Sequence, residues 1–493
     1  MWVPDHDMQA STIGQARGET GDLINTSLHE SRPQQQIFGR ITGERELWRQ
    51  HDRGALAVCL ARHPRDTLGV AGEVADGGVE LRESDLHHDG LAGQMEIDIT
   101  AKDYVIEVLG DLRQIDASAW NSLLARQPSP TPFMRHEYLA ALHDSGSAVP
   151  STGWAAQFIT VRRDRDLLAA CALYLKSHSY GEYVFDWAWA DAYQRHGLRY
   201  YPKLLGAVPF TPVPGTRLLA ADEASRALLV RAIQAHAMQG KLSSAHLLFV
   251  DDADRAALAS AGWMLREGVQ FHWLQDEAQP CADFDDLLAR LQRDKRKKIL
   301  QERRRVADAG VTFAAFEGSD ITTAQWDFFH HCYTLTYAAH HSTPYLTREF
   351  FTRMATDMPQ HWVMFIAQRA GEPIAASLIA IDHPQHAAWG RYWGSTCHVP
   401  CMHFEACYYQ PLQWCIAHGI RRFEGGAQGE HKMARGLLPV RTSSAHWLRD
   451  ARFAAAVADF LASEGSGVGN YLDELRERNP FKTPQDVIAG QDD

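Results

Sequence analysis

The sequence has no apolar run long enough to cross a membrane. Its longest hydrophobic tract, LLAACALYL from Leu167, is about half of the roughly 18 residues that a spanning helix needs. The first thirty or so residues also lack the apolar core of a secretory signal. The eight cysteines have no regular spacing, which is typical of a reducing compartment. We therefore expect a cytoplasmic protein without a membrane span.

The chain is also short of positive charge. Lys+Arg number 49 against 61 Asp+Glu, a formal net charge of -12, so the surface as a whole repels nucleic acid. The exception is the run DKRKKILQERRR from Asp294 to Arg305, in which seven residues are basic and two are acidic. This run can form a phosphate-contacting surface, for tRNA or a nucleotide-linked precursor. The alternative is a solvated helix face.

The 493 residues, 45% of them hydrophobic, are enough for two or three domains with proper cores. Residues 1–95 have neither a helical nor a strand period, and we expect a disordered extension there. Residues 96–280 and 281–493 share an element order of helix, helix, hairpin, strand, helix and strand. A repeat of about 190 residues predicts two similar domains, each a mixed sheet flanked by helices.

The periodicity predicts helices and strands in both domains. Helices are expected at 116–127, 133–146, 223–241, 252–262, 284–310, 324–340, 348–358 and 402–419. Strands are expected at 95–112, 154–164, 166–178, 182–191, 245–250, 268–275, 311–318, 361–369, 372–382, 387–396 and 420–426. The fold class is therefore α/β, and the basic run lies on the helix that opens the second domain.

The stretch FEGGAQGEHKMARGLLPV, which begins at Phe423, carries most of the candidate chemistry. After a pair of glycines it brings carboxylate, imidazole, ammonium and guanidinium groups together within about a dozen residues. Glu430 and His431 can accept a proton. Gly425 and Gly426 let the backbone approach a ligand. The alternative is a strand-to-helix turn with a solvated, charged start.

Two long segments resemble the FemAB-like branch of the GNAT acyltransferase superfamily. They are EYVFDWAWADAYQRHGLRYYPKLLGAVPFTPVPGTRLL, from Glu182, and RYWGSTCHVPCMHFEACYYQPLQWCIAHGIRRFEGGAQGEHKMARGLLPV, from Arg391. The likeness covers roughly residues 102 to 480 and implies two tandem GNAT-like domains. It also implies transfer of an acyl or aminoacyl group to an amine in a bacterial cytoplasmic enzyme.

The resemblance implies a role for Lys432, which falls where the Fem-type ligases carry the lysine of a Phe-Lys-x-x-Phe-Gly motif. His431 replaces the first phenylalanine, and Arg435 with Gly436 replaces Phe-Gly. Lys432 is therefore the leading oxyanion-stabilising or donor-binding residue, and Arg435, three residues on, shares one face with it if the segment is helical. No tightly bound cofactor is expected. The donor implied is aminoacyl-tRNA, with residues 294–305 as a tRNA surface, or acetyl-CoA.

The acceptor that the resemblance implies is a peptidoglycan (muropeptide) precursor or another amine-bearing molecule. The aromatic run from Tyr183 to Tyr193 suits such a ligand, because stacked rings offer flat apolar faces with polar edges. Strand alternation instead puts Phe185, Trp187 and Trp189 in a core. The residues predicted to bind a substrate are Asp186, Asp191, Tyr201, Lys203, Arg391, Gly425, Gly426 and Arg435.

Glu405 opens the predicted helix 402–419, where a GNAT-like fold splits two strands, and is a further catalytic candidate. Cys397, His398, Cys401 and His403 are spaced too closely for a typical zinc site, so no metal is expected. A Gln/Arg-x-x-Gly-x-Gly/Ala pyrophosphate loop is missing, because the nearest run, from Gln368 to Pro373, turns between two strands. The missing loop is an argument against acetyl-CoA as the donor, although it does not exclude it.

The competing hypothesis is a non-catalytic protein that uses the same fold to recognise a cell-wall precursor or an amine-bearing ligand. The two hypotheses differ in whether the polar side chains of residues 424–435 converge on a cleft.

Overall fold

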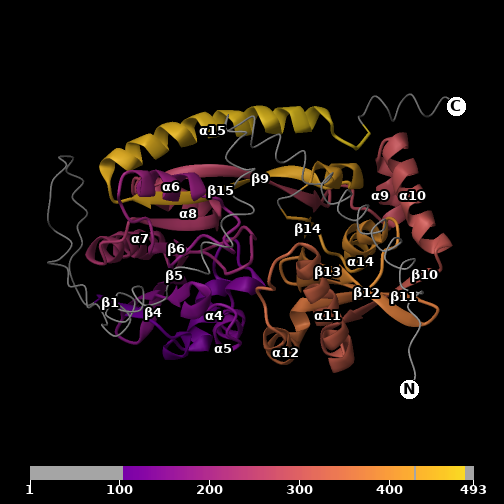
Figure 1. Cartoon of the computed structure of the whole chain (residues 1–493), viewed down its shortest axis with the longest axis horizontal. Coiled ribbons are helices and arrows are strands. Elements are labelled where there is room, and N and C mark those ends of the chain that lie inside the picture. Colours follow the sequence, from indigo (N-terminus) through magenta and orange to yellow (C-terminus); the bar gives the residue numbers. More distant parts are fainter. Residues whose placement is uncertain (1–103, 427–428, 483–493) are drawn as a thin grey trace, which may run out of the picture.

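The computed structural model describes residues 104–426 and 429–482. The predicted extension 1–95 and residues 95–103 of the predicted strand 95–112 lie outside the described residues, and the remainder of that strand contains β1 (Tyr104–Leu109). Within the described residues the chain forms two α/β halves that lie side by side under one long C-terminal helix (Figure 1).

The first half contains strands β1 to β9 and helices α4 to α8. Its strands are β1 (Tyr104–Leu109), β2 (Trp154–Ala156), β3 (Phe158–Arg163), β4 (Asp166–Cys171), β5 (Leu173–Lys176), β6 (Lys203–Gly206), β7 (Leu219–Ala220), β8 (Ser244–Val250) and β9 (Met264–Leu274). Its helices are α4 (Ala117–Ala125), α5 (His136–Asp144), α6 (Trp187–Arg195), α7 (Glu223–Gln239) and α8 (Asp252–Ser260).

The second half begins with a helical pair and ends with the longest helix of the described residues. Its strands are β10 (Val311–Glu317), β11 (Trp362–Arg369), β12 (Glu372–Asp382), β13 (Ala387–Ser395), β14 (Arg422–Glu424) and β15 (Leu438–Leu448). Its helices are α9 (Phe284–Arg290), α10 (Arg293–Asp308), α11 (Thr323–Ala339), α12 (Arg348–Asp357), α13 (Met402–Phe404), α14 (Gln410–Ala417) and α15 (Ala451–Glu477).

One mixed sheet runs through both halves. Its eleven strands follow the order β10-β11-β12-β13-β14-β9-β15-β8-β6-β5-β2, and a smaller sheet has the order β1-β3-β4-β7. The halves exchange strands at the centre: β9 pairs with β14, and β15 lies between β9 and β8. His446, for example, faces Met264 on one side and His246 on the other. Helix α15 packs over β9 and β15 and bridges the halves (Figure 1).

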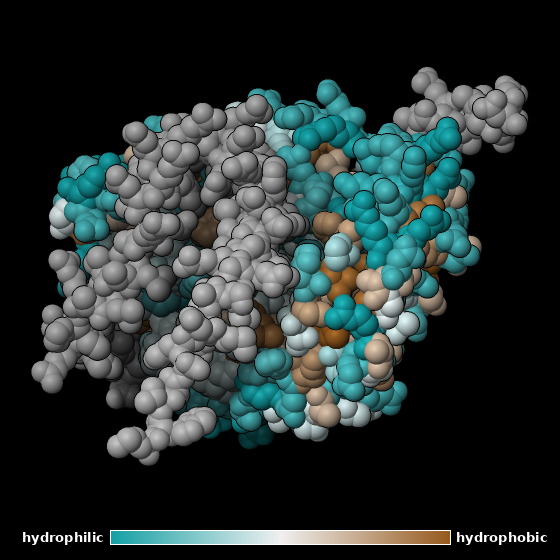
Figure 2. Space-filling model, turned by 45° about the vertical axis from the view of Figure 1, so that its right-hand side comes forward, coloured by the Kyte–Doolittle hydropathy of each residue, from teal (hydrophilic) through white to brown (hydrophobic). Residues whose placement is uncertain are grey.

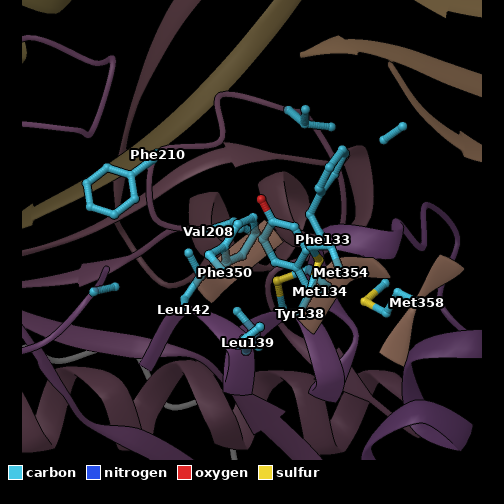
Figure 3. Packing of buried hydrophobic residues seen from close by; sticks show 14 of the residues in the cluster. Phe133, Met134, Tyr138, Leu139, Leu142, Val208, Phe210, Phe350, Met354 and Met358 are labelled. Carbon is cyan, nitrogen blue, oxygen red and sulfur yellow. The ribbon is translucent and has the colours of Figure 1, made fainter. Parts of the chain in front are cut away.

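An apolar core joins the two halves below this sheet. Phe133 from the first half meets Trp389 from the second, with ring centroids 5.5 Å apart in edge-to-face geometry. Tyr138 meets Phe350 in the same way at 5.4 Å (Figure 3). All four side chains are fully buried. Burial of each such side chain contributes about 2–3 kcal/mol, so this contact holds the halves in a fixed relation.

The structure corrects the predicted strand at 182–191. Residues from Trp187 form helix α6, whose buried residues are Trp189 and Tyr193, four positions apart. Phe185 and Trp187 are exposed, so the expected core placement holds for Trp189 alone. The aromatic residues alternate with a period of two, as in a strand, but the burial of their side chains follows the period of a helix.

Other predicted elements are divided in the structure, as two examples show. The expected helix 284–310 is broken into α9 and α10 at Leu291, which is fully buried, has extended backbone and forms a β-bridge with Phe481. The expected strand 166–178 is divided into β4 and β5 at Ala172, where the chain passes from the small sheet to the large one. In both places a tertiary contact overrides a continuous local pattern.

Candidate functional site

The site lies where two parallel strands of the second half separate. β13 and β14 pair only from Ala387 to Trp389 on β13. Beyond Glu424 the chain turns toward β9, and the Gly425 N–H donates to the Phe271 carbonyl at 2.8 Å. On β13 a bulge opposite Leu378 and Ile379 makes Arg391 an extra residue. The two strands therefore diverge and leave an opening at the centre of the sheet.

A cavity of about 430 Å³ occupies this opening. Its walls come from both halves: β9, β13, the turn after β14, segments 183–185 and 210–213, and α15. The lining is mainly apolar and aromatic, with a few charged groups, as is usual for sites that bind organic ligands. The predicted site residues in the wall are Arg391, Gly425, Gly426, Glu430 and Lys432.

The two glycines serve the close packing of the turn as well as the cavity wall. A Cβ on Gly425 would lie 2.4 Å from a methyl group of Leu437 and 3.1 Å from the Phe271 carbonyl oxygen. Gly426 has φ of +77°, in the left-handed region that favours glycine. Their small size lets the turn return to β9, which brings the residues after it into the cavity wall.

Lys432 lies in the turn η8 (Glu430–Arg435) and reaches back across it. Its side chain is buried, and Nζ donates to the carbonyl oxygens of Gly425 and Gly426, at 2.5 Å and 3.3 Å. The ammonium group therefore fixes the turn that follows β14. Its positive charge stands in the cavity wall near the point where the strands diverge.

Glu430 and His431, the predicted proton acceptors, have different surroundings. Glu430 lines the cavity, but one of its oxygens accepts from Tyr471 at 3.2 Å and the other from Arg478 at 2.8 Å. His431 is not in the cavity wall; its ring packs against Phe404. Burial, together with the nearby basic groups of η8, lowers the pKa of His431 to about 3, which makes it a weak base.

Sequence reasoning did not single out Glu424, the last residue of β14. This side chain is buried and lines the cavity, and burial raises its pKa to about 7. Arg422, with Nε 3.2 Å from Oε1, and the indole N–H of Trp389 oppose this rise. By strict geometry, Oε2 accepts no hydrogen bond from the described residues. The sequence signal is modest: an acid that ends a buried strand just before two glycines.

A line of polar groups connects Glu424 to the first half. His272, opposite Glu424 on β9, has Nε2 3.8 Å from Oε2. The same nitrogen lies 3.1 Å from Gln270 Oε1, and Gln270 Nε2 donates to the Pro212 carbonyl at 2.8 Å. Burial lowers the pKa of His272 to about 3, so the imidazole is neutral and donates from Nε2 to the glutamine oxygen.

Arg391 lines the cavity from β13 and holds the halves together. Its Nη2 donates to the Phe210 carbonyl at 3.1 Å and to the Thr211 hydroxyl at 3.2 Å. The guanidinium also lies over the rings of Phe133 and Tyr392. Its charge is therefore fixed beside the cavity by contacts with the first half.

The acceptor-binding residues predicted in the first half do not line the cavity. Lys203 is fully buried and donates to Glu182 and Asp186. Burial opposes ionisation of Asp186, but Lys203 outweighs it and lowers the pKa of that carboxyl. Tyr201 contacts the same cluster through Ser179. The cluster lies behind segment 183–185 and fixes that part of the wall.

The remaining predicted residues also lie outside the cavity wall. Asp191 is partly exposed and pairs with Arg195 at 3.1 Å. Glu405 is buried beside a second, shallow hollow, where its Oε1 accepts from Arg303. Arg435 points away from the cavity toward α10. The structure thus brings together five of the twelve predicted residues.

Two observations bear on metals and membranes. In residues 104–426 and 429–482, no group of three or more His, Cys, Asp or Glu side chains is placed to hold a metal ion. Over the same ranges, no helix combines the length and apolar character that a membrane crossing requires.

Residues 111–483, more than half of the chain, match the FemAB-like family, described as peptidoglycan biosynthesis/recognition. The chain therefore belongs to the FemAB-like family. The expected fold class is confirmed, because the chain is a mixed α/β protein in which one large mixed sheet runs through both halves. A search of the curated proteins found no match.

Several solved structures resemble the chain at low identity. A crystal structure of FemX has 10% identity and a TM-score of 0.44, with 70% of this chain and 98% of that one covered. L-PGS from Bacillus licheniformis has 11% identity and a TM-score of 0.45, covering 70% and 96%. A tandem GNAT protein from the clavulanic acid biosynthesis pathway has 14% identity and a TM-score of 0.38, covering 70% and 98%.

Proposed function

We propose that the protein transfers an acyl group to an amine bound in the cavity, with Glu424 as the general base. The observation that carries this proposal is the buried carboxylate at the point where β13 and β14 diverge. By strict geometry its Oε2 accepts no hydrogen bond from the described residues, and burial raises its pKa to about 7 against the opposing effects of Arg422 and Trp389. A base with a pKa near neutrality can take a proton from an ammonium group at physiological pH.

The reaction proceeds by direct transfer. The amine gives a proton to Glu424, and its nitrogen then attacks the carbonyl carbon of an ester or thioester donor. The carbon–oxygen or carbon–sulfur bond breaks, and the leaving group takes up a proton. The positive charges of Lys432 and Arg391 in the cavity wall favour the oxyanion that forms between these steps.

The acceptor proposed is a muropeptide precursor or another molecule that carries an amine on a sugar or peptide body. Exposed aromatic side chains stand at the cavity in segment 183–185, where Tyr183 and Phe185 line it. Tyr471 lines it from α15. Flat rings with polar edges suit such an acceptor, because they stack on its body and leave the amine free to approach Glu424.

The donor proposed is an aminoacyl-tRNA, with α10 as its phosphate-contacting surface. Five basic residues of this helix are exposed: Arg293, Lys297, Lys298, Arg304 and Arg305. Figure 2 turns this end of the molecule toward the reader, and its upper right is mostly hydrophilic. In a chain with a net charge of -12, this local concentration favours a polyanion.

The cavity favours an enzyme over a binding protein. Of the polar segment 424–435, Glu424, Glu430 and Lys432 face one cavity, whereas His431 and Arg435 turn away from it. A carboxylate with a pKa near 7 serves proton transfer better than ligand recognition, because its charge changes with small changes in pH.

The test combines ligand binding with transfer. Thermal unfolding of the purified protein is measured with charged tRNA, acetyl-CoA and a nucleotide-linked muropeptide, since a ligand of the native state raises the midpoint. Product formation is then followed by mass spectrometry for the protein and for Glu424→Gln. Stabilisation by charged tRNA or the muropeptide, with product lost in Glu424→Gln, supports the proposal. Stabilisation by acetyl-CoA alone would identify acetyl-CoA as the donor in place of aminoacyl-tRNA. Binding of a ligand without any product favours the hypothesis of a non-catalytic binding protein.

A further inference from the structure

Glu302 is an acidic side chain within the basic helix α10, and it faces inward. It is 6% exposed, whereas Arg304 and Arg305, which follow closely in the sequence, are exposed. The sequence predicts that this helix is a charged surface, and the proposed tRNA contact involves only its outer face. The inner face contacts the turn η8 that carries Lys432.

The carboxylate of Glu302 is fully occupied. Arg435 Nη2 donates to both of its oxygens, at 3.0 Å and 2.9 Å, and the Tyr409 hydroxyl donates to Oε2. Arg435 is 2% exposed, so the pair is shielded from water, and its guanidinium lies 3.5 Å from the ring centroid of Phe404. Charge-assisted bonds in such surroundings hold their partners in a narrow range of positions.

Arg435 belongs to the same six-residue turn as Lys432. Its Nη1 donates to the His431 carbonyl at 2.6 Å, so the guanidinium braces the turn internally as well as fixing it to α10. At the other end, Lys432 Nζ is held by the carbonyls of the residues after β14. The turn is thus tied to α10 at one end and to β14 at the other.

We propose that Glu302 is a positioning residue: through Arg435 it sets where η8 holds Lys432 and Glu430 against the cavity. This inference rests on the proposed function only in taking the cavity as the reaction site. Glu302 is not in the cavity wall, so it acts through Arg435 rather than on a substrate.

The test uses amide hydrogen exchange by mass spectrometry on the full chain and on Glu302→Gln. Three amides of the turn are hydrogen-bonded within it: Lys432 to Gly429, Gly436 to Met433, and Leu437 to the Lys432 carbonyl. We expect their exchange to become at least about tenfold faster in the variant, because the turn opens locally more often. Exchange in the core strands stays unchanged.

Glu464→Gln is the matched control. Glu464 is also buried, and it pairs with Arg266 in another wall of the cavity. Its loss should speed exchange in β9 and α15 more than in η8, whose Glu430 is bound by Tyr471 and Arg478 further along the chain. If Glu302→Gln leaves exchange in η8 unchanged, or speeds it no more than elsewhere in the chain, the proposal is overturned.

Two further measurements separate positioning from general stability. Tyr409→Phe removes one hydrogen bond from an uncharged donor to Glu302 and should speed exchange of the same amides by a smaller factor. This variant keeps the proposal testable if Glu302→Gln fails to fold. In a transfer assay, Glu302→Gln should lower the plateau rate by on the order of 100-fold, as a misplaced group does, without moving the pH of half-maximal rate. A folded variant with an unchanged plateau contradicts the proposal. A wild-type protein without transfer activity refutes the proposed function, while the exchange result still decides the role of Glu302.

Discussion

Replacing Glu424 with glutamine should make the protein more stable and less active at the same time. The pKa of this carboxyl rises from its ordinary value of 4.5 to about 7 because burial disfavours the charge. One pKa unit corresponds to about 1.4 kcal/mol, so keeping the folded protein ionised at this position costs on the order of 3 kcal/mol.

The sign follows from proton binding. Because the folded state binds the proton more tightly than the unfolded state, the stabilisation due to the protonated carboxyl is complete below pH 4.5 and is lost as the pH rises through about 7. Glutamine does not ionise, so this cost is absent in the variant. Glu424→Gln should therefore gain about 3 kcal/mol over the wild type at pH 8, and much less at pH 5.

The assay is urea unfolding of both proteins at pH 5 and pH 8, with transfer measured at pH 8. Other buried acids, such as Glu182 and Asp254, also have raised pKa values near 7, so the difference between variant and wild type is the quantity to compare. Transfer should fall by about 10²- to 10⁴-fold, as on loss of a general base. A variant that is less stable than the wild type at pH 8 refutes the reasoning about burial. A stable variant that keeps its activity refutes Glu424 as the base.

Three other predictions concern the surroundings of the site. Lys203→Met should cost about 3–5 kcal/mol in urea unfolding, because two buried carboxylates lose their partner; a loss below about 1 kcal/mol would show a pair no stronger than an exposed one. Gly425→Ala should cost about 1–3 kcal/mol by overpacking a buried leucine, whereas the control Gly465→Ala, which meets open space on α15, should not destabilise. The charge reversals Lys297→Glu and Lys298→Glu should weaken tRNA binding and flatten its salt dependence in titrations at several salt concentrations; unchanged binding argues against α10 as the contact surface.

The sequence predicted most elements with a strong local period. Helices α7, α8, α11 and α12 and the strands β8 and β10 to β13 were expected close to where the structure has them. The strand predicted at 182–191 is wrong. Three aromatic residues alternate there as in a strand, but Trp189 is buried by contact with β15 and α15. The local pattern of apolar and polar residues does not show contacts between segments that are far apart in the sequence.

The site was predictable in part. Glu430 and the two glycines stand out because they follow a strand end, and Lys432 stands out through the family resemblance; all four line the cavity, and their roles stay predictions. Glu424 was missed because its character depends on burial, and burial depends on β9, which reaches it from the other half of the chain. Lys203 and Asp186 are predicted to bind a ligand, but in the structure they form a buried ion cluster. The sequence does not show that these two residues lie next to each other.

The exchange of β9 and β15 has a consequence for how the protein is made. His246 and His446 contact each other although 200 residues separate them. During synthesis on the ribosome, the first half therefore emerges without the strand that completes its sheet, and β8 keeps an open edge until β15 arrives. Pairing over such a distance in sequence is slow. A gene cut between the halves would yield two fragments that each lack a central strand, so they should become stable only when they are produced together.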